Sequence, residues 1–349
     1  MAESTAAAVD GVDTAKVTAW FCENAGDVEP PLEFSLITGG HSNLTFDVRD
    51  QAEGHWVLRR PPLKQVLATA HDMSREHRII GALAPTPVPV PPVVGLCTDE
   101  TVNGAPFYVM GFVEGRIVRD PATARELSMQ QREAAGNSLV DVLADIHAVD
   151  IDAAGLGDFA KRESYIERQL KRWYSQFNKS KTRDLPVVDE VYDRLVNLIP
   201  EQGPATIVHG DYRLDNCLIG DDGTVAAVLD WEICTLGDPL ADLGLLLVYW
   251  GDADDPSFTR ASAPTTVEGF PGPETVLARY AERSGRDTSQ IDYYVAFGFW
   301  KLACIVEGVY ARYVGGAMGQ RGDPSSFEFF GQQVITLAEE AREAMGRVE

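Results

Sequence analysis

The spacing of hydrophobic positions changes along the chain. Near the beginning, apolar residues alternate with polar ones in three short segments, which are 34–37, 44–48 and 55–59. Alternation of this kind is typical of strands that bury one face. From about residue 111 most of the chain has the spacing of helices, with one interruption at 206–231. The pattern predicts a small β-rich half followed by a larger helical half.

Helical segments also accompany the predicted strands. One short helix is expected within the first 25 residues and another at about 68–83. Five prolines from 85 to 92 exclude a helix interior and predict an extended connector, after which 106–110 has the pattern of a further strand. We therefore expect an α+β protein of two lobes, a typical setting for a small-molecule site. The division predicted is 1–110 for the N-terminal lobe and 111–349 for the C-terminal lobe.

The interruption at 206–231 has the pattern of short strands joined by tight connections. Asp221-Asp222-Gly223 is a strong turn signal between two apolar runs, so these runs are expected to form a hairpin. The two ends of a hairpin lie side by side, which would bring Asn216 close to Asp230, with Asp211 in the preceding loop. Oxygen ligands of this kind suit Mg²⁺. A further carboxylate left free can accept a proton from an attacking hydroxyl.

Composition narrows the range of functions. The 349 residues are 45% hydrophobic, enough for a large core, and 53 acidic against 30 basic residues give a formal charge of −23. Such a field repels phosphate backbones and anionic lipids, so neither nucleic acid nor a membrane is an expected partner. Leu240–Trp250 and Val295–Val314 are the most apolar stretches, and both are expected to be buried helices.

Cysteine usage and the first residues indicate where the protein resides. The five cysteines are odd in number and scattered, which fits neither a disulfide framework nor a zinc ribbon. Met1–Asp10 is acidic and Ala-rich, unlike a signal peptide. We expect reduced thiols and a cytoplasmic location. No pattern indicates an oligomeric state.

Two motifs of this chain are His-Gly-Asp-Tyr-Arg-Leu-Asp-Asn at 209–216 and Leu-Asp-Trp-Glu at 229–232. Together they resemble the catalytic segment of the aminoglycoside phosphotransferase family. That family shares the protein-kinase-like fold, whose plan is H-x-D-x-x-x-x-N and then D-F-G. The run at 237–244 also resembles the family, and the likeness extends from about residue 34 to 250. The segments 57–62 and 229–232 look most like the branch found fused to acyl-CoA dehydrogenases.

The resemblance implies a role for each matched residue. Asp211 would be the catalytic base or would orient the substrate hydroxyl. Asn216 and Asp230 would hold Mg²⁺ on the phosphates of ATP. His209 would be a structural member of the loop, and Asp242 would anchor the loop through backbone N–H groups. The catalytic loop is thus 209–216 and the metal-binding segment 230–232, with Glu232 added for its nearness to Asp230.

A kinase-like site also needs a cation on the phosphates and an acid that positions it. Glu76 falls on the apolar stripe of the helix at 68–83, where a lone carboxylate is costly unless it is paired. It should therefore face a buried cation. Period-two alternation puts Arg59 on one face of its strand with Val57, and Arg60 on the other. We expect Arg59 to be the partner, at the position where the family usually has Lys, with Arg60 as the alternative.

Three further residues are candidates for nucleotide contacts. Ser42 lies in the segment Gly39–Asn43 between two strands, and its hydroxyl could cover phosphates. Met110 and Phe112 lie at the connector between the lobes, where backbone groups would meet the adenine.

The predicted function is ATP- and Mg²⁺-dependent transfer of the γ-phosphoryl group to a hydroxyl of a small molecule. The acceptor would be an aminoglycoside-like antibiotic or a hydroxylated metabolite. Arg59 in the Lys position motivates one alternative, a catalytically weak or inactive nucleotide-binding module. The likeness to the dehydrogenase-linked branch motivates another, a kinase acting on a hydroxylated acyl compound. A phosphohydrolase that uses water with the same carboxylates is a third.

Overall fold

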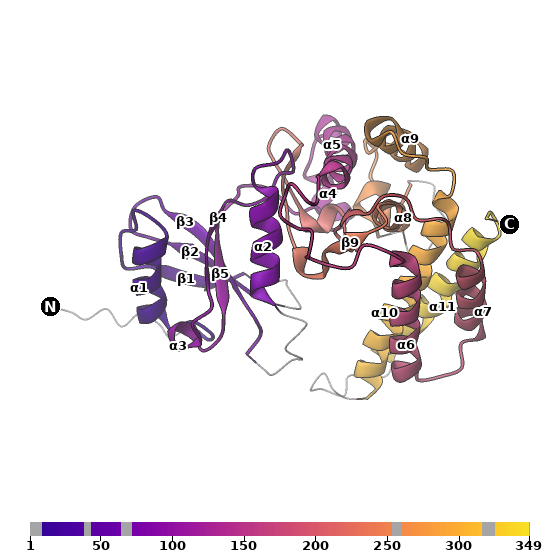
Figure 1. The fold of residues 1–349 in the computed structure, drawn as a ribbon, viewed down its shortest axis with the longest axis horizontal. Coiled ribbons are helices and arrows are strands. Elements are labelled where there is room, and N and C mark those ends of the chain that lie inside the picture. The colour runs from indigo at the N-terminus through magenta and orange to yellow at the C-terminus, as the bar shows by residue number, and fades with distance from the viewer. Residues whose placement is uncertain are drawn as a thin grey trace. The chain divides into compact units, whose positions relative to one another are not determined.

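The computed structural model describes residues 9–37, 43–63, 72–252, 260, 262–315 and 325–348, which form two compact units (Figure 1). The first unit runs to Gly115 and includes Ala226–Cys234, and the second takes up the chain at Arg116 and again at Thr235.

The short return segment Ala226–Cys234 packs with the first unit for a local reason. The Val228 N–H donates to the Pro89 carbonyl at 2.9 Å, and an Arg75 N–H donates to the Cys234 carbonyl at 3.0 Å. The sequence pattern had placed this segment in the second lobe and the division after residue 110. As an assignment of domains, that division stays a prediction.

The first unit is built on a five-stranded antiparallel sheet of order β1-β2-β3-β5-β4. Its strands are β1 (Glu33–Leu36), β2 (Leu44–Arg49), β3 (His55–Arg60), β4 (Val93–Cys97) and β5 (Phe107–Gly111). Its helices are α1 (Thr14–Asn24), α2 (Met73–Leu83) and the single turn α3 (Glu100–Asn103). Figure 1 shows α1 against one side of the sheet and α2 against the other. The sequence pattern missed β4, because that strand directly follows the proline-rich connector.

Strand β3 shows the alternation that its sequence predicts. Leu58 packs into the core beneath α1 with Phe21 and Phe46, and Arg59 points to the opposite side, toward α2. Arg60 lies on the α1 side, where one guanidinium nitrogen donates to the Gly11 carbonyl at 2.5 Å and to the Asn103 carbonyl at 3.0 Å. Arg60 therefore ties backbone segments together, and Arg59 is the arginine on the α2 side.

The second unit is mainly helical. Its helices are α4 (Pro121–Arg125), α5 (Met129–Ala148), α6 (Tyr165–Ser180), α7 (Pro186–Asn197), α8 (Leu240–Tyr249), α9 (Pro273–Ser284), α10 (Ile291–Val314) and α11 (Ser325–Met345). Strand β6 (Thr206–Val208) pairs antiparallel with β9 (Thr235–Gly237), a strand that lies beyond the predicted interruption. Strands β7 (Cys217–Ile219) and β8 (Val225–Val228) form the predicted hairpin.

Close packing of α8 on α10 depends on a glycine. A Cβ atom at Gly244 would lie 2.6 Å from the Tyr294 backbone, which real Cβ atoms do not tolerate. Nearly all of α8 is buried, as expected from its sequence. Helix α10 is long and apolar enough to cross a membrane, but 61% of its most apolar window is buried inside the protein. Its first half is buried, and its last residue, Val314, is exposed.

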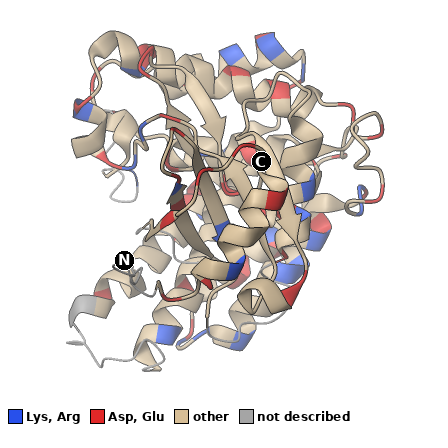
Figure 2. Cartoon of the chain, turned by 90° about the vertical axis from the view of Figure 1, so that its left-hand side faces the viewer, with Lys and Arg blue, Asp and Glu red and all other residues tan. Residues whose placement is uncertain are grey.

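The acidic excess is distributed over many elements. Figure 2 shows Asp and Glu on helices and loops alike, interspersed with Lys and Arg. Many of these form surface ion pairs, such as Arg279 with Asp141 at 2.7 Å. A mixed charged surface of this kind is typical of a solvated exterior.

The core beneath α1 gives a direct test of the fold. Leu58 is fully buried in β3, and Leu36 in β1 is 48% exposed. Leu58→Ala should lower the free energy of unfolding by about 2–5 kcal/mol, because it leaves a cavity. The same substitution at Leu36 should change it by less than about 0.5 kcal/mol. Urea titration measures both, and equal losses would contradict this packing.

Candidate active site

The loop after β6 is held by one buried carboxylate. Asp242, in the first turn of α8, is 1% exposed and accepts the N–H of His209 at 2.6 Å and that of Gly210 at 2.8 Å. Burial alone would raise the pKa of Asp242, but the hydrogen bonds and the neighbouring imidazoles of His147 and His209 hold it below its usual value. The anchoring role that the sequence resemblance implied for Asp242 is therefore visible in the structure.

The chain turns sharply inside this loop. Gly210 has φ +90°, a conformation that L side chains rarely adopt, so a glycine is required there. His209 is fully buried, and its Nδ1 accepts the N–H of Asp211 at 3.3 Å. His209 thus shapes the loop from within, as expected.

Asp211 and Asn216 lie together at the end of the loop. The Asn216 side-chain amide donates to the Asp211 carbonyl at 2.7 Å and to the Asp211 carboxylate at 3.0 Å. Arg213 Nε lies 3.5 Å from the other carboxylate oxygen of Asp211. Because Asn216 turns its nitrogen toward Asp211, its amide oxygen is left for another ligand, and oxygen is the atom that Mg²⁺ prefers.

A cavity of about 240 Å³ lies beside this loop, within the second unit. Its lining consists of Val118, Arg119, Arg213, Leu214, Asp215, Leu246, Tyr249, Trp250, Ser262, Ala263, Pro264, Thr265 and Gln333. The lining mixes apolar side chains with polar ones, among them two arginines and one carboxylate, Asp215, whose pKa is raised by burial. Burial and the charge of Asp211 raise the pKa of the Tyr249 hydroxyl, which places Asp211 next to this cavity.

A second cluster of charges belongs to the first unit and centres on Arg59. One guanidinium nitrogen lies 2.6 Å from Glu76 Oε1, and the other lies 2.6 Å from Asp230 Oδ1 and 3.9 Å from Glu232 Oε2. Glu76 is 1% exposed on the inner face of α2. The sequence argument that Glu76 needs a buried cation, and that Arg59 supplies it, is confirmed. The contact of Arg59 with Asp230 was not predicted.

This cluster carries an excess of negative charge. Burial raises the pKa of Glu76 to about 7 against the attraction of Arg59, and the charges of Asp230 and Glu232 raise it further. Burial would lower the pKa of Arg59, but Glu76 and Asp230 raise it, so the guanidinium stays charged. Three carboxylates thus face one guanidinium, which is an arrangement that a further cation would balance.

Asp230 itself adopts an unusual backbone conformation. Its φ is +63°, in the left-handed region, and its side chain is 35% exposed. A non-glycine residue held in this region is often part of a functional site. Asp230 lies in the first unit, whereas Asp211 and Asn216 lie in the second. That the three side chains share one metal ion stays a prediction.

The remaining predicted site residues are the three that were expected to contact the nucleotide. Met110 is buried in β5 opposite Val57 of β3. The Phe112 ring stacks on His55, with ring centroids 3.6 Å apart. Ser42 lies outside the described residues. The contacts of all three with a nucleotide stay predictions.

Sequence reasoning missed Lys301. This residue lies within the apolar stretch Val295–Val314, and its ammonium group donates to the Gly210 carbonyl at 2.9 Å. The argument that led from Glu76 to Arg59 would have found it, since a single charge on an apolar helix face also needs a partner.

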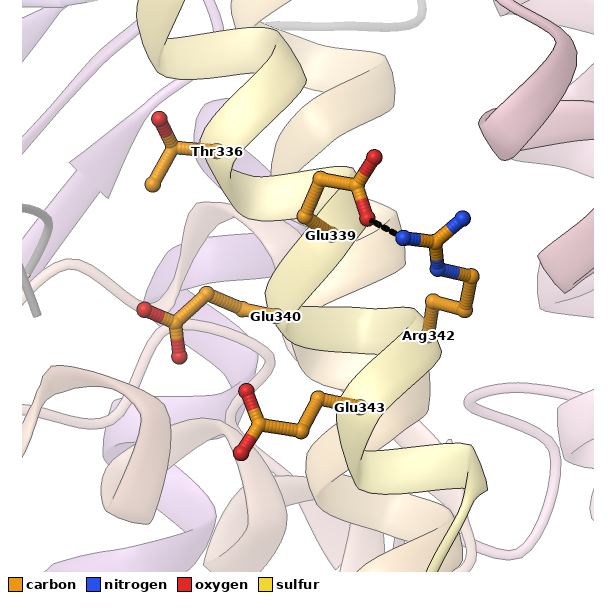
Figure 3. A pocket seen from close by; sticks show the side chains of 5 residues that line it. All are labelled: Thr336, Glu339, Glu340, Arg342 and Glu343. Carbon is orange, nitrogen blue, oxygen red and sulfur yellow. Dashed lines mark ion pairs between the residues drawn. The ribbon is translucent and has the colours of Figure 1, made fainter.

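Within the described part of the chain, no three His, Cys, Asp or Glu side chains gather as a metal cage. A hollow of about 430 Å³ lies along α11, lined by Thr336, Glu339, Glu340, Arg342 and Glu343 (Figure 3). These residues follow one another at helical spacing on one helix, and Glu339 pairs with Arg342. The hollow is therefore the charged, solvated face of α11.

The anchoring of the loop can be tested by substitution of Asp242. Asp242→Asn would turn an amide N–H toward a buried backbone N–H, so we expect a loss of about 1–3 kcal/mol in the free energy of unfolding. Asp141→Asn, which breaks the partly exposed pair with Arg279, is the control and should cost less than about 1 kcal/mol. Chemical denaturation distinguishes them, and equal costs would show that Asp242 does not hold the loop.

Comparison with known proteins gives a consistent result. The family model described as "Phosphotransferase enzyme family" matches residues 33–272. The chain is 37% identical over 286 residues to acyl-CoA dehydrogenase family member 10 of Mus musculus. The matched region covers 81% of this chain but only 27% of the mouse protein. The chain spans between about a quarter and two fifths of the length of such dehydrogenase-family relatives.

Solved structures show the same fold. A protein assigned as an aminoglycoside phosphotransferase from Ralstonia eutropha JMP134 is 33% identical, with a TM-score of 0.83 over 97% of this chain and 99% of that one. The streptomycin–ATP complex of APH(2")-IIa has a TM-score of 0.56 over 86% of this chain and 91% of that one, at 15% identity. The expected protein-kinase-like fold is confirmed. With the family model matched over 33–272, the chain belongs to the phosphotransferase enzyme family.

Proposed function

We propose that this protein transfers the γ-phosphoryl group of ATP, with Mg²⁺, to a hydroxyl group of a small molecule. The observation that carries the proposal is the loop held by Asp242, in which Asp211 and Asn216 lie in contact. Membership of the phosphotransferase family supports the reaction type. A relative of the same fold has been solved with ATP and a small-molecule antibiotic bound, which supports ATP as donor.

Each residue of the loop has a role in this proposal. Asp211 accepts the proton of the acceptor hydroxyl or orients that hydroxyl for attack. Asn216 contributes its amide oxygen, and Asp230 a carboxylate, to Mg²⁺. Both are hard oxygen ligands, and the negative excess around Arg59 suits a divalent cation. When bound, the ion would neutralise charge that develops on the phosphates.

In this proposal Arg59 is the cation that binds the phosphates, and Glu76 is the acid that positions it. Their 2.6 Å contact fixes the guanidinium, which can bind phosphate oxygens in a bidentate manner where a lysine would act as a point charge. Ser42 would cover the phosphates, and backbone groups around Met110 and Phe112 would meet the adenine. Because Arg59 also contacts Asp230, its guanidinium would have to share that carboxylate with the metal ion.

The cavity beside Asp211 supports a hydroxylated acyl compound over an aminoglycoside as the acceptor. A polycation would be expected to meet several carboxylates, whereas this lining has one, Asp215, beside the guanidinium groups of Arg119 and Arg213 and several apolar side chains. The likeness to acyl-CoA dehydrogenase family members agrees with an acyl acceptor. The acceptor that this cavity favours is therefore a small hydroxylated molecule with an apolar chain and an anionic group.

We also propose a cytoplasmic location, for which the thiols offer support. The structure describes all five cysteines, and none of them forms a disulfide bond: Cys22, Cys97, Cys217, Cys234 and Cys304. Cysteines that form no disulfide are typical of a reducing compartment.

Substitution of Asp211 tests the role of the loop. Asp211→Asn should lower kcat by about 10²–10⁴, because the amide cannot accept the proton. Asp145→Asn, which only weakens a surface pair with Arg283, is the matched control and should leave kcat unchanged. The assay follows Mg·ATP-dependent phosphorylation of hydroxylated acceptors. Equal turnover in both variants would refute the role of Asp211. ATP binding without transfer to any acceptor would favour the inactive nucleotide-binding module.

The chemistry of the cavity is tested by competing acceptors. A hydroxyacyl thioester should be phosphorylated with a kcat/KM at least about tenfold higher than kanamycin, since the lining offers arginines and apolar surface. Arg119→Met should lower kcat/KM for the hydroxyacyl acceptor by about tenfold and leave the KM for ATP unchanged. A preference for kanamycin, or an Arg119 variant that is indifferent to the acceptor, would contradict the acyl acceptor.

A further inference from the structure

Helix α10 carries a buried ammonium group that the proposed chemistry has not used. Lys301 is 7% exposed, and its Nζ donates to the Gly210 carbonyl at 2.9 Å. The same nitrogen lies over the Trp173 ring of α6, 5.8 Å from the ring centroid. Among the described residues, no carboxylate lies within 4 Å of this nitrogen. A buried charge without a paired carboxylate lowers stability, so its presence calls for an explanation.

The Gly210 carbonyl is one end of the peptide bond that leads into Asp211. The N–H of that same peptide bond donates to His209 Nδ1 at 3.3 Å, and the preceding N–H of Gly210 is held by Asp242. Gly210 has no side chain, and glycine adopts both signs of φ readily, so the peptide has little restraint of its own. Lys301 supplies the restraint on the carbonyl side.

We propose that Lys301 is a positioning residue for phosphoryl transfer, which fixes the Gly210–Asp211 peptide and thereby the direction of the Asp211 carboxylate. The inference rests on the role proposed above for Asp211. Lys301 acts through the backbone and is not in contact with the reacting atoms. A shift of about 1 Å in a catalytic group costs about 10²-fold in rate, so a single hydrogen bond at this peptide can control turnover.

A comparison within the same helix separates this role from ordinary packing. Glu307, also fully buried in α10, accepts the Thr182 N–H at 2.8 Å and the Thr182 hydroxyl at 2.9 Å and lies 3.5 Å from Arg183. Glu307 therefore has a guanidinium partner as well as two hydrogen-bond donors. Lys301 has no such ion-pair partner among the described residues: burial lowers its pKa, only the more distant Asp211 and Asp242 oppose that effect, and Arg172 adds to it. A residue kept at a cost in stability is typical of a functional site.

Three variants test the proposal: Lys301→Met, Lys301→Arg and, as the matched buried control on α10, Glu307→Gln. The first readout is amide hydrogen exchange, which does not depend on turnover. Lys301→Met should speed exchange in the loop 209–216 by about tenfold or more, because the peptide loses its restraint. Glu307→Gln should instead speed exchange near Thr182. Thermal unfolding of Lys301→Met should stay close to wild type, since a buried charge is removed along with the hydrogen bond.

The second readout is the steady-state turnover of Mg·ATP with the hydroxyacyl thioester. Lys301→Met should lower kcat about 10- to 100-fold with the KM for ATP within about twofold, and Lys301→Arg, which keeps the charge and a donor, should recover most of the loss. Unchanged exchange at 209–216, or a fall in kcat no larger than that of Glu307→Gln, would overturn the inference. A wild-type protein that turns over no Mg·ATP would instead overturn the proposed function itself.

Discussion

The buried carboxylate of Asp242 is the contact on which the rest of the candidate site depends. It accepts two consecutive backbone N–H groups, those of His209 and Gly210, at the point where the chain leaves β6. Hydrogen bonds to a charged acceptor contribute about 1.5–3 kcal/mol each, more than neutral ones. Because Asp242 lies in the first turn of α8, and α8 packs closely on α10 at Gly244, the loop is fixed to the centre of the helical unit. The positions of Asp211 and Asn216 depend on that attachment.

The two compact units differ in the partners that surround their buried positive side chains. In the first, Arg59 is surrounded by Glu76, Asp230 and Glu232, so that the positive charge is over-compensated. In the second, Lys301 meets a backbone carbonyl, and its charge is under-compensated. The first arrangement favours the approach of a cation, and the second holds the peptide that leads into Asp211. Both are expected in a protein that handles the charge of a transferring phosphoryl group.

Much of the fold, and part of the site, could be predicted from local sequence pattern. Period-two alternation correctly placed Arg59 and Arg60 on opposite faces of β3. The cost of burying Glu76 correctly predicted that this carboxylate has a cationic partner. The turn at Asp221–Gly223 correctly indicated a hairpin. These successes have one cause, since each depends on residues close in sequence or on a rule about a single buried charge.

The features that were missed depend on contacts between distant parts of the chain. Arg59 and Asp230 are 171 positions apart, and Lys301 and Gly210 are 91 apart, so no local pattern links them. The packing of Ala226–Cys234 with the first unit likewise depends on hydrogen bonds to Pro89 and from Arg75.

Whether transfer to a hydroxyl occurs is best measured by ³¹P NMR of the protein with Mg·ATP and a hydroxyacyl thioester. A new phosphomonoester resonance that grows as ATP is consumed is the expected result. Inorganic phosphate as the sole product, whatever hydroxylated acceptor is supplied, would contradict a phosphotransferase and indicate hydrolysis by water.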